Sequence, residues 1–254
     1  MHNNVILRIT FLLLLSVCMS NVQAEKSAPE FIVEVVSSDW KPYVYEEKGV
    51  IKGSAYKIIK DVLDRAGVRF NYRILPWARA YRNGLDKENY LIGGLGRTPK
   101  RETLFHWIGP VTAGADIFFY KLKSNPVKII DVDEAKNYSI GAERNSYYHD
   151  FLLQNEFDVN NISPVTYPDQ LIRMLVSNRI PFILLDERRF LKLAEELSLD
   201  PALFDKALFA FNVTDNLAFS KKTSLELVKR LRDAYQKLVN EGEIRTVLLS
   251  TVGE

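Results

Sequence analysis

The sequence predicts an α/β protein, and three observations support this class. Runs rich in β-branched and aromatic residues alternate along the chain with segments whose apolar residues recur at helical spacing. Residues 182–185, Phe-Ile-Leu-Leu, are apolar throughout, as expected for a strand buried on both faces of a parallel sheet. The alternation restarts near residue 138. We therefore expect two lobes, each a mainly parallel sheet flanked by helices.

The first part of the chain contains one clear strand and one clear helix. The β-branched run at residues 31–36 predicts a strand. Residues 54–66 predict a helix, because Ile58, Ile59 and Val62 share one face and Gly67 follows as a stop. The expected strands are 31–36, 68–75, 91–92 and 117–120, and the expected helices are 54–66 and 77–83.

The second part repeats this order. Pro168 suits the first turn of a helix, Ser224 is a good N-cap for a long final helix, and Gly242 is a good stop for it. The expected strands are 138–140, 163–165, 182–185 and 216–219. The expected helices are 146–154, one that begins at Pro168, 187–197 and 224–239.

Residues 1–24 have the composition of a secretory signal peptide. His2 and Arg8 precede a short apolar run, and the small residue Ala24 stands where cleavage is expected. The run is shorter than the roughly 20 residues of a membrane-spanning helix. We expect export to the periplasm, with an uncleaved anchor or lipidation at Cys18 as less favoured alternatives.

Composition and spacing exclude several classes of function. The 34 Lys and Arg residues nearly balance the 32 Asp and Glu residues, which gives no reason to expect a nucleic-acid partner. A single cysteine excludes an intramolecular disulfide and a cysteine-based zinc site. His106 and His149 lack metal-ligand spacing, and Gly93 to Gly96 match no nucleotide-binding loop. We therefore expect no metal and no cofactor.

Charged residues at two places could bind a small ligand. Arg97, Lys100 and Arg101 follow the glycine-rich segment, where they could capture a carboxylate or form a solvated turn. Asp186 follows the buried strand 182–185, where it could bind an ammonium group or cap a helix. Spacing alone leaves both alternatives open.

The order of motifs resembles that of amino-acid-type periplasmic solute-binding proteins, the receptors of ABC importers. The resemblance covers residues 30–250. It rests on five motifs: Asp39-Trp-Lys-Pro-Tyr43, Gly53-Ser-Ala-Tyr56, Gly94-Leu-Gly-Arg-Thr-Pro-Lys-Arg101, Asn178-Arg-Ile-Pro-Phe-Ile-Leu-Leu-Asp186 and Leu217-Ala-Phe-Ser-Lys-Lys222. It implies a type II periplasmic binding fold, with a ligand cleft between two lobes.

The resemblance also implies roles for single residues. Arg101 would bind the ligand carboxylate, Asp186 the ammonium group, and Trp40 would form an aromatic wall. The other implied ligand-binding residues are Gly94, Gly96, Asn145 and Ser146. Trp77 departs from the family pattern but comes close to the expected cleft, where it could contact the ligand or be part of the core. The sequence departs from the family pattern at Ala55 and Lys57, where acids are usual, and at Asn145, where glycine is common. The ligand is therefore not assigned beyond a small zwitterion or carboxylate, and Arg79, Arg97, Glu143 and Arg144 receive no role.

The expected mechanism is capture by closure of two lobes. Residues 25–120 and 213–254 would form the first lobe, and residues 121–212 the second. The crossings are expected near residues 120–125 and 211–216. A ligand that bridges the lobes favours the closed state. We expect a monomer that delivers its ligand to an ABC permease.

Two other functions remain as alternatives. The first is an enzyme, because proteins like cyclohexadienyl dehydratase also resemble this family. Glu143 is then the best candidate for the catalytic acid. The second alternative is a ligand-binding partner of a separate sensor protein.

Overall fold

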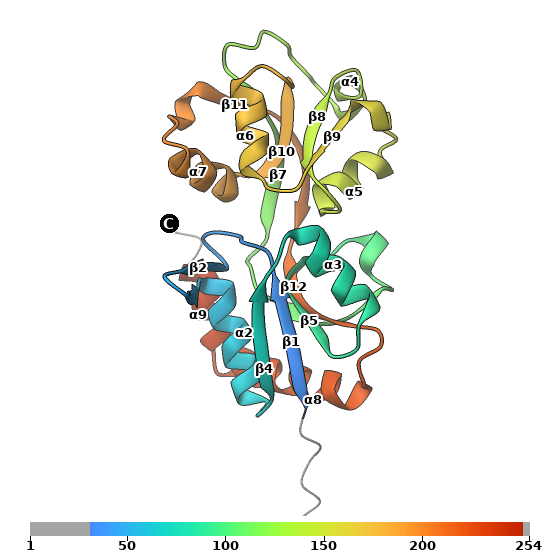
Figure 1. Ribbon diagram of the computed structural model, residues 1–254, viewed down its shortest axis with the longest axis vertical. Coiled ribbons are helices and arrows are strands. Elements are labelled where there is room, and N and C mark those ends of the chain that lie inside the picture. The colour runs from blue at the N-terminus through green and yellow to red at the C-terminus, as the bar shows by residue number, and fades with distance from the viewer. Residues whose placement is uncertain (1–30, 251–254) are drawn as a thin grey trace, which may run out of the picture. The chain divides into compact units, whose positions relative to one another are not determined.

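The computed structural model describes residues 31–250, with side chains described as far as residue 248. The expected signal peptide and Cys18 lie outside this range. The described chain forms two five-stranded sheets, with helices packed on them, and one small hairpin (Figure 1). The hairpin consists of β2 (Tyr45–Glu47) and β3 (Val50–Lys52). The predicted α/β class and its two-sheet organisation are confirmed.

The first sheet combines strands from the two ends of the described chain. Its order is β4 (Arg69–Ile74), β1 (Ile32–Ser37), β5 (Tyr90–Gly96), β12 (Asp215–Ser220) and β6 (Phe105–Pro110). β1 is parallel to β4 and β5, whereas β12 is antiparallel to β5 and β6. The carboxyl ends of β1 and β4 therefore lie at the same edge of the sheet, which is where open α/β sheets bind ligands.

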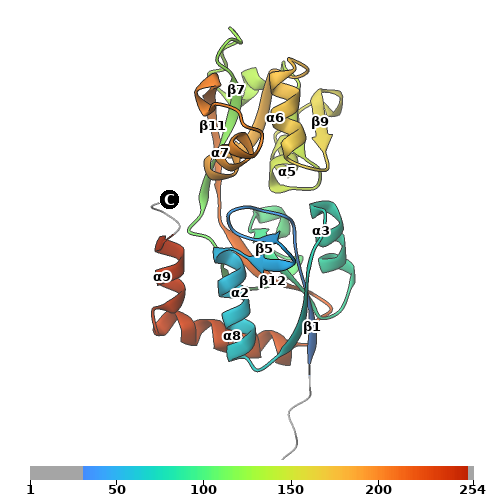
Figure 2. The same cartoon turned by 60° about the vertical axis from the view of Figure 1, so that its left-hand side comes forward.

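Helices cover both faces of the first sheet, because successive side chains of a strand point to opposite faces. Val33 and Val35 of β1 pack with α2 (Ser54–Arg65) and α8 (Leu225–Asn240), and Val36 packs with α3 (Trp77–Asp86). Figure 2 shows α2 and α8 on one side of β1 and α3 on the other. The last described helix is α9 (Glu243–Ser250).

The second sheet is formed by one continuous part of the chain. Its order is β11 (Phe204–Val213), β7 (Ala115–Leu122), β10 (Phe182–Asp186), β8 (Ile140–Glu143) and β9 (Ile162–Val165). β10, β8 and β9 are parallel, whereas β7 is antiparallel to both β10 and β11. Every residue of β10 is buried, as its apolar run predicts.

Four helices belong to this second part of the chain. They are α4 (Val132–Ala135), α5 (Tyr147–Gln154), α6 (Asp169–Val176) and α7 (Glu187–Glu196). Side chains cap three of them: Asp131 caps α4, Ser146 caps α5, and Asp186 caps α7. No helix within residues 31–250 is both long and apolar enough to cross a membrane.

The chain crosses between the sheets at two short segments. It leaves the first sheet after Pro110 and enters β7 at Ala115, and it returns between Val213 and Asp215. The first crossing was expected near residues 120–125, but residues 120–122 complete β7. β7 extends further toward its amino end than expected, because it pairs with β11 from Ala115 onward.

Several elements differ from the sequence prediction. β6, β11 and the β2–β3 hairpin were not predicted, and β8 begins at Ile140 rather than at residue 138. β11 was missed because two register shifts interrupt its pairing with β7 and blur the alternation of its side chains. Four of the eight neighbouring strand pairs in the two sheets are antiparallel, so each sheet is mixed.

Candidate functional site

Two cavities share four lining residues and are formed by side chains from both sheets. The larger has a volume of about 380 Å³, which suits a small molecule, and the smaller has a volume of about 20 Å³. The shared residues are Ser38, Trp77, Glu143 and Arg189. We call the two cavities together the candidate site.

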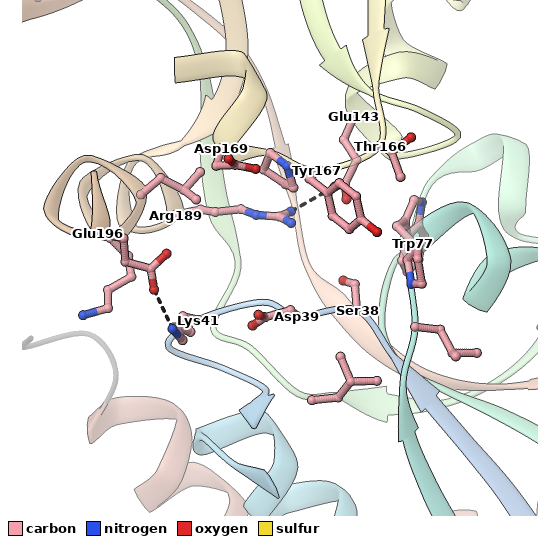
Figure 3. Close-up of a pocket in the computed structure, with 16 residues that line it drawn as sticks. Ser38, Asp39, Lys41, Trp77, Glu143, Thr166, Tyr167, Asp169, Arg189 and Glu196 are labelled. Atoms are coloured by element: carbon pink, nitrogen blue, oxygen red, sulfur yellow. Dashed lines mark hydrogen bonds and ion pairs between the residues drawn. The ribbon is translucent and has the colours of Figure 1, made fainter. Parts of the chain in front are cut away.

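The larger cavity lies at the carboxyl ends of parallel strands from both sheets. Ser38 and Asp39 follow β1, Trp77 follows β4, and Glu143 ends β8. Figure 3 shows Glu143 and Arg189 on one side of this cavity, across from Ser38 and Asp39. The position therefore agrees with the rule for ligand sites in open α/β sheets.

Glu143 and Arg189 form a buried ion pair in the wall of the site. Arg189 Nη1 donates a hydrogen bond of 3.1 Å to Glu143 Oε2. Burial raises the pKa of the Glu143 carboxyl, and the positive charge of Arg189 opposes that shift. Burial alone would lower the pKa of Arg189, but Glu143, Tyr148, Tyr147 and Asp186 together outweigh it, and the pKa is raised. Arg189 therefore stays charged.

The guanidinium of Arg189 has one donor left over. Its Nη2 atom is buried and has no hydrogen-bond partner among the described residues. Arg189 lines both cavities of the candidate site. A buried N–H donor without an acceptor is unfavourable, so Nη2 is suited to bind an acceptor atom of a ligand.

Asp215 supplies a second buried carboxyl group, in the smaller cavity. It stands at the start of β12 and is 3% exposed. Burial raises the pKa of Asp215 to about 8, the nearby charge of Asp186 adds to the rise, and Arg189 and Arg101 oppose it. A ligand cation beside Asp215 would favour its ionised form.

Aromatic side chains complete the smaller cavity. Trp40, Trp77, Tyr147 and Tyr148 line it together with Gly94. Gly94 has a φ of +96°, and a Cβ atom there would lie 2.6 Å from the Trp40 ring. Only glycine therefore allows Trp40 to lie against β5.

Arg101 lies outside both cavities of the candidate site and is fully buried. Its Nη2 atom is 2.8 Å from Asp150 Oδ2 of α5 and also donates to the Asn145 carbonyl at 3.1 Å. The guanidinium carbon lies 5.7 Å and 4.8 Å from the ring centres of Trp77 and Tyr81. Arg101 thus connects the first sheet to α5 of the second part of the chain.

Asp186 also makes contacts within the protein. Its Oδ1 accepts a hydrogen bond of 3.0 Å from the Arg189 backbone N–H, and its Oδ2 accepts one of 3.0 Å from the Tyr148 hydroxyl. It lines a third cavity of about 480 Å³, together with Asp116 and Arg188. Arg101 and Asp186 are therefore not brought together in one cavity.

The other predicted site residues are divided between the two cavities and the contacts around them. Trp40, Gly94 and Ser146 line the smaller cavity, and Trp77 lines both. The Trp77 indole N–H donates a hydrogen bond of 2.8 Å to the carbonyl of Asn145. Gly96 lies against Tyr147, where a Cβ atom would come within 2.3 Å of the ring.

Three charged residues of the site were not predicted as ligand contacts. Arg189 follows Asp186 by three residues, so helical spacing could have placed both near the same end of α7. Glu143 ends β8 and had no role outside the enzyme alternative. Asp215 had no local signal, because its burial depends on residues from both sheets. Within residues 31–250, no group of three or more His, Cys, Asp or Glu side chains is arranged to hold a metal ion.

Comparison with solved structures identifies the fold. A histidine kinase sensor domain with similarity to periplasmic binding proteins superposes with a TM-score of 0.77 at 13% identity, covering 88% of this chain and 97% of that one. The arginine-, lysine-, histidine-binding protein ArtJ of Geobacillus stearothermophilus gives 0.69 at 16% identity, covering 87% and 95%. The substrate-binding protein AbpA of Streptococcus pneumoniae, bound to L-arginine, gives 0.67 at 19% identity, covering 86% and 93%.

At these identities the likeness shows the fold, which is that of the periplasmic binding proteins. No curated protein matches the sequence significantly. The sequence does match one protein family over residues 32–250, which is most of its length. The chain belongs to family 3 of the bacterial extracellular solute-binding proteins.

Proposed function

We propose that this protein binds a small amino-acid-like solute in the periplasm and delivers it to an ABC importer. The observation that carries the proposal is a cavity whose wall contains a buried ion pair of the second part, Glu143 and Arg189, and is completed by Ser38 and Trp77 of the first part. Such a wall suits a zwitterion better than a polyanion or an apolar molecule. ArtJ, an arginine-, lysine-, histidine-binding protein, and AbpA, which binds L-arginine, support the same class.

Binding works by bridging the two parts of the protein. A ligand in the candidate site contacts Ser38 and Trp77 from the first part and Glu143 and Arg189 from the second. It therefore stabilises the arrangement in which these residues face one another. A ligand shifts such an equilibrium only by its difference in affinity for the two states, so contacts on both parts are required.

The proposed ligand contacts include residues that the sequence singled out. Trp40, Gly94, Ser146 and Trp77 line the candidate site, which supports their role. A ligand carboxylate could reach Arg101 only by replacing Asp150. An ammonium group at Asp186 would have to bind in addition to the hydrogen bonds that this carboxylate accepts from Tyr148 and from the backbone of α7. The roles of Arg101 and Asp186 stay predictions, which calorimetric binding measurements on Arg101→Gln and Asp186→Asn would test.

The function is tested with a thermal-shift screen of the twenty L-amino acids, polyamines and small carboxylates. We expect amino acids of one class to raise the melting temperature, because a ligand that binds only the folded state stabilises it. Isothermal titration calorimetry then measures the dissociation constant of each stabilising compound. The absence of stabilisation by every amino acid would contradict the proposal.

A sensor role is the second candidate, suggested by the likeness to a histidine kinase sensor domain. Both roles require ligand binding, but only transport requires a permease. Deletion of the gene should abolish uptake of the labelled ligand if the protein serves an importer. Normal uptake with loss of a ligand-dependent transcriptional response would favour the sensor.

The enzyme alternative depends on Glu143, which is buried in the wall of the site and has a raised pKa. Its ion pair with Arg189 occupies one of its oxygen atoms, which argues against a free catalytic acid. We expect purified protein to leave prephenate and arogenate unchanged, as monitored by NMR. Turnover that Glu143→Gln abolishes would establish an enzyme instead.

A further inference from the structure

Arg101 is the residue to which the family resemblance assigns the ligand carboxylate, and a side chain of the protein already occupies it. Its Nη2 atom lies 2.8 Å from Asp150 Oδ2 and also donates to the Asn145 carbonyl at 3.1 Å. Arg101 follows β5 in the first part of the chain, whereas Asp150 belongs to α5 in the second. The place of a ligand carboxylate is therefore filled by a carboxylate from the opposite part of the protein.

Asp150 satisfies the guanidinium of Arg101 only in part. The strongest pairing of an arginine with a carboxylate uses two parallel hydrogen bonds. Asp150 instead divides its oxygen atoms, since Oδ2 pairs with Arg101 while Oδ1 lies 2.6 Å from Lys100 Nζ. The Nε atom of Arg101 is buried and has no hydrogen-bond partner among the described residues, and Nη1 donates only a long bond of 3.4 Å to the Gly96 carbonyl. Arg101 thus keeps donors that a better-placed carboxylate can use.

We propose that Asp150 competes with the ligand for Arg101 and thereby determines which ligands the site accepts. A ligand with a carboxylate displaces Asp150 and pairs with Arg101 in its place. A ligand without a carboxylate leaves the pair of Arg101 and Asp150 as it is and gains nothing from it. This inference rests on the proposed function, because it concerns the same amino-acid-like ligand, and it keeps Arg101 as the contact of the ligand carboxylate.

Exchange of the two carboxylates requires the two parts of the protein to separate. Arg101 is fully buried, and neither cavity of the candidate site reaches it. Movement of α5 away from α3 exposes Arg101 and also breaks the hydrogen bond from the Trp77 indole to the Asn145 carbonyl. When only a fraction of a protein is competent to bind, the apparent affinity is reduced by that fraction. Asp150 therefore weakens ligand binding to the extent that its pair with Arg101 favours the state without a ligand.

The test measures ligand affinity in Asp150→Asn, which removes the competing charge and keeps the size of the side chain. The twenty L-amino acids are screened by thermal shift on the full chain, as wild type and as variant. Each one that binds is titrated by calorimetry beside the amine that lacks its carboxyl group, such as agmatine for L-arginine or cadaverine for L-lysine. We expect Asp150→Asn to bind the amino acid about tenfold or more tightly than the wild type does. Its dissociation constant for the amine should stay within about threefold of the wild-type value.

Tyr43→Phe is the matched control, because it also removes a contact between the two parts but does not involve Arg101. The Arg188 guanidinium of α7 donates a hydrogen bond of 3.0 Å to the Tyr43 hydroxyl. Loss of this bond favours separation of the parts without freeing Arg101, so the variant should bind the amino acid no more tightly than the wild type. Equal tightening in Tyr43→Phe and Asp150→Asn would overturn the inference, because separation alone would then control the affinity.

A measurement on the wild type tests the inference even if Asp150→Asn does not fold. Because Asp150 joins the two parts in the absence of a ligand, the radius of gyration from small-angle scattering should change little when a saturating amino acid is added. A clear contraction, or unchanged or weaker binding of the amino acid by Asp150→Asn, would overturn the inference while leaving the proposed function intact. Absence of binding of every amino acid to both proteins would overturn the proposed function and the inference together.

Discussion

Asp215 shows how burial changes the chemistry of a carboxyl group. Its pKa is raised to about 8 by loss of solvent, and the charge of Asp186 works in the same direction. Arg189 and Arg101 carry opposite charge and reduce the rise. The folded protein therefore holds a proton on Asp215 at pH values where the unfolded chain, with a pKa near 3.8, has lost it.

This difference predicts a pH dependence of stability. Between about pH 4 and pH 8 the folded state binds more protons than the unfolded state, so the contribution of Asp215 to stability falls as the pH rises. Asp215→Asn removes this pH-dependent contribution, because an amide does not titrate. We expect the variant to melt at least about 4 °C above the wild type at pH 9, and to differ less at pH 5.

Melting curves followed by circular dichroism at pH 5, 7 and 9 measure this effect. Asp233→Asn, on the exposed side of α8, is the matched control and should leave the pH dependence as in the wild type. An identical pH dependence for Asp215→Asn and the wild type would mean that Asp215 is not buried in its neutral form.

At the scale of elements, the position of α8 depends on a strand residue without a side chain. Gly109 of β6 lies under the ring of Tyr235, and a Cβ atom at Gly109 would be 2.3 Å from that ring. The Tyr235 hydroxyl also donates a hydrogen bond of 2.9 Å to the Pro110 carbonyl. The helix and the strand are therefore in close contact.

Gly109→Ala should destabilise the protein by about 1–3 kcal/mol, because the added methyl group meets a ring held in the core. Urea unfolding curves measure the loss. Tyr235→Leu replaces the ring by a smaller side chain. Gly109→Ala should therefore lower the free energy of unfolding less in the Tyr235→Leu background than in the wild type. Additive losses would show that the two residues are not in contact.

The start of α8 depends on Ser224. Its Oγ accepts a hydrogen bond of 3.3 Å from the Leu227 backbone N–H, as the sequence predicts for an N-cap. Ser224→Ala should lower the free energy of unfolding by about 1 kcal/mol. Ser224→Asp keeps an acceptor at the same position and should retain most of the stability; equal losses for both variants would argue against capping.

At the scale of the whole described chain, polar contacts join the part built on the first sheet to the part built on the second. The pair of Arg101 and Asp150 is buried, whereas the pair of Lys41 and Glu196 is about one-third exposed. Burial decides how much each pair contributes to stability. Solvent screens the charges of an exposed pair, whereas loss of one partner of a buried pair leaves the other charge buried without a counter-charge. The Arg101–Asp150 pair should therefore dominate.

Asp150→Asn should lower the free energy of unfolding by about 3–5 kcal/mol, because it leaves the buried Arg101 without the carboxylate that balances its charge. Lys41→Gln should change stability by less than about 1 kcal/mol. Denaturant unfolding of both variants checks the difference. Small-angle scattering should also show a larger radius of gyration for Asp150→Asn than for Lys41→Gln, and equal radii would contradict a joining role for Arg101.

Some parts of the fold could be predicted because their signal is local. The helix at residues 54–65 has one continuous apolar face, and the strand at 182–186 is apolar throughout. β11 could not be predicted in this way, since its bulges shift the alternation on which strand prediction depends. The hairpin at residues 45–52 was missed because its strands are only three residues long and mostly exposed.

The candidate site was predicted less completely than the fold. Trp40 and Gly94 lie in the walls of the cavities, and each belongs to a motif visible in the sequence. The partner of Arg101 could not be predicted, because Asp150 is 49 residues away on a helix of the second part. The raised pKa of Asp215 depends on burial by both parts, which no local pattern records.

The two crossings between the sheets have a consequence for how the gene can be rearranged. Residues 115–213 form the second sheet, and the two ends of this segment, Ala115 and Val213, are paired neighbours in β7 and β11. The segment therefore has the form of an inserted domain, whose ends meet where it joins its host. We expect that it can be excised as a unit, with Gly114 and Thr214 joined by a short linker. By the same geometry, we expect the host to accept a related insert of different specificity at this junction.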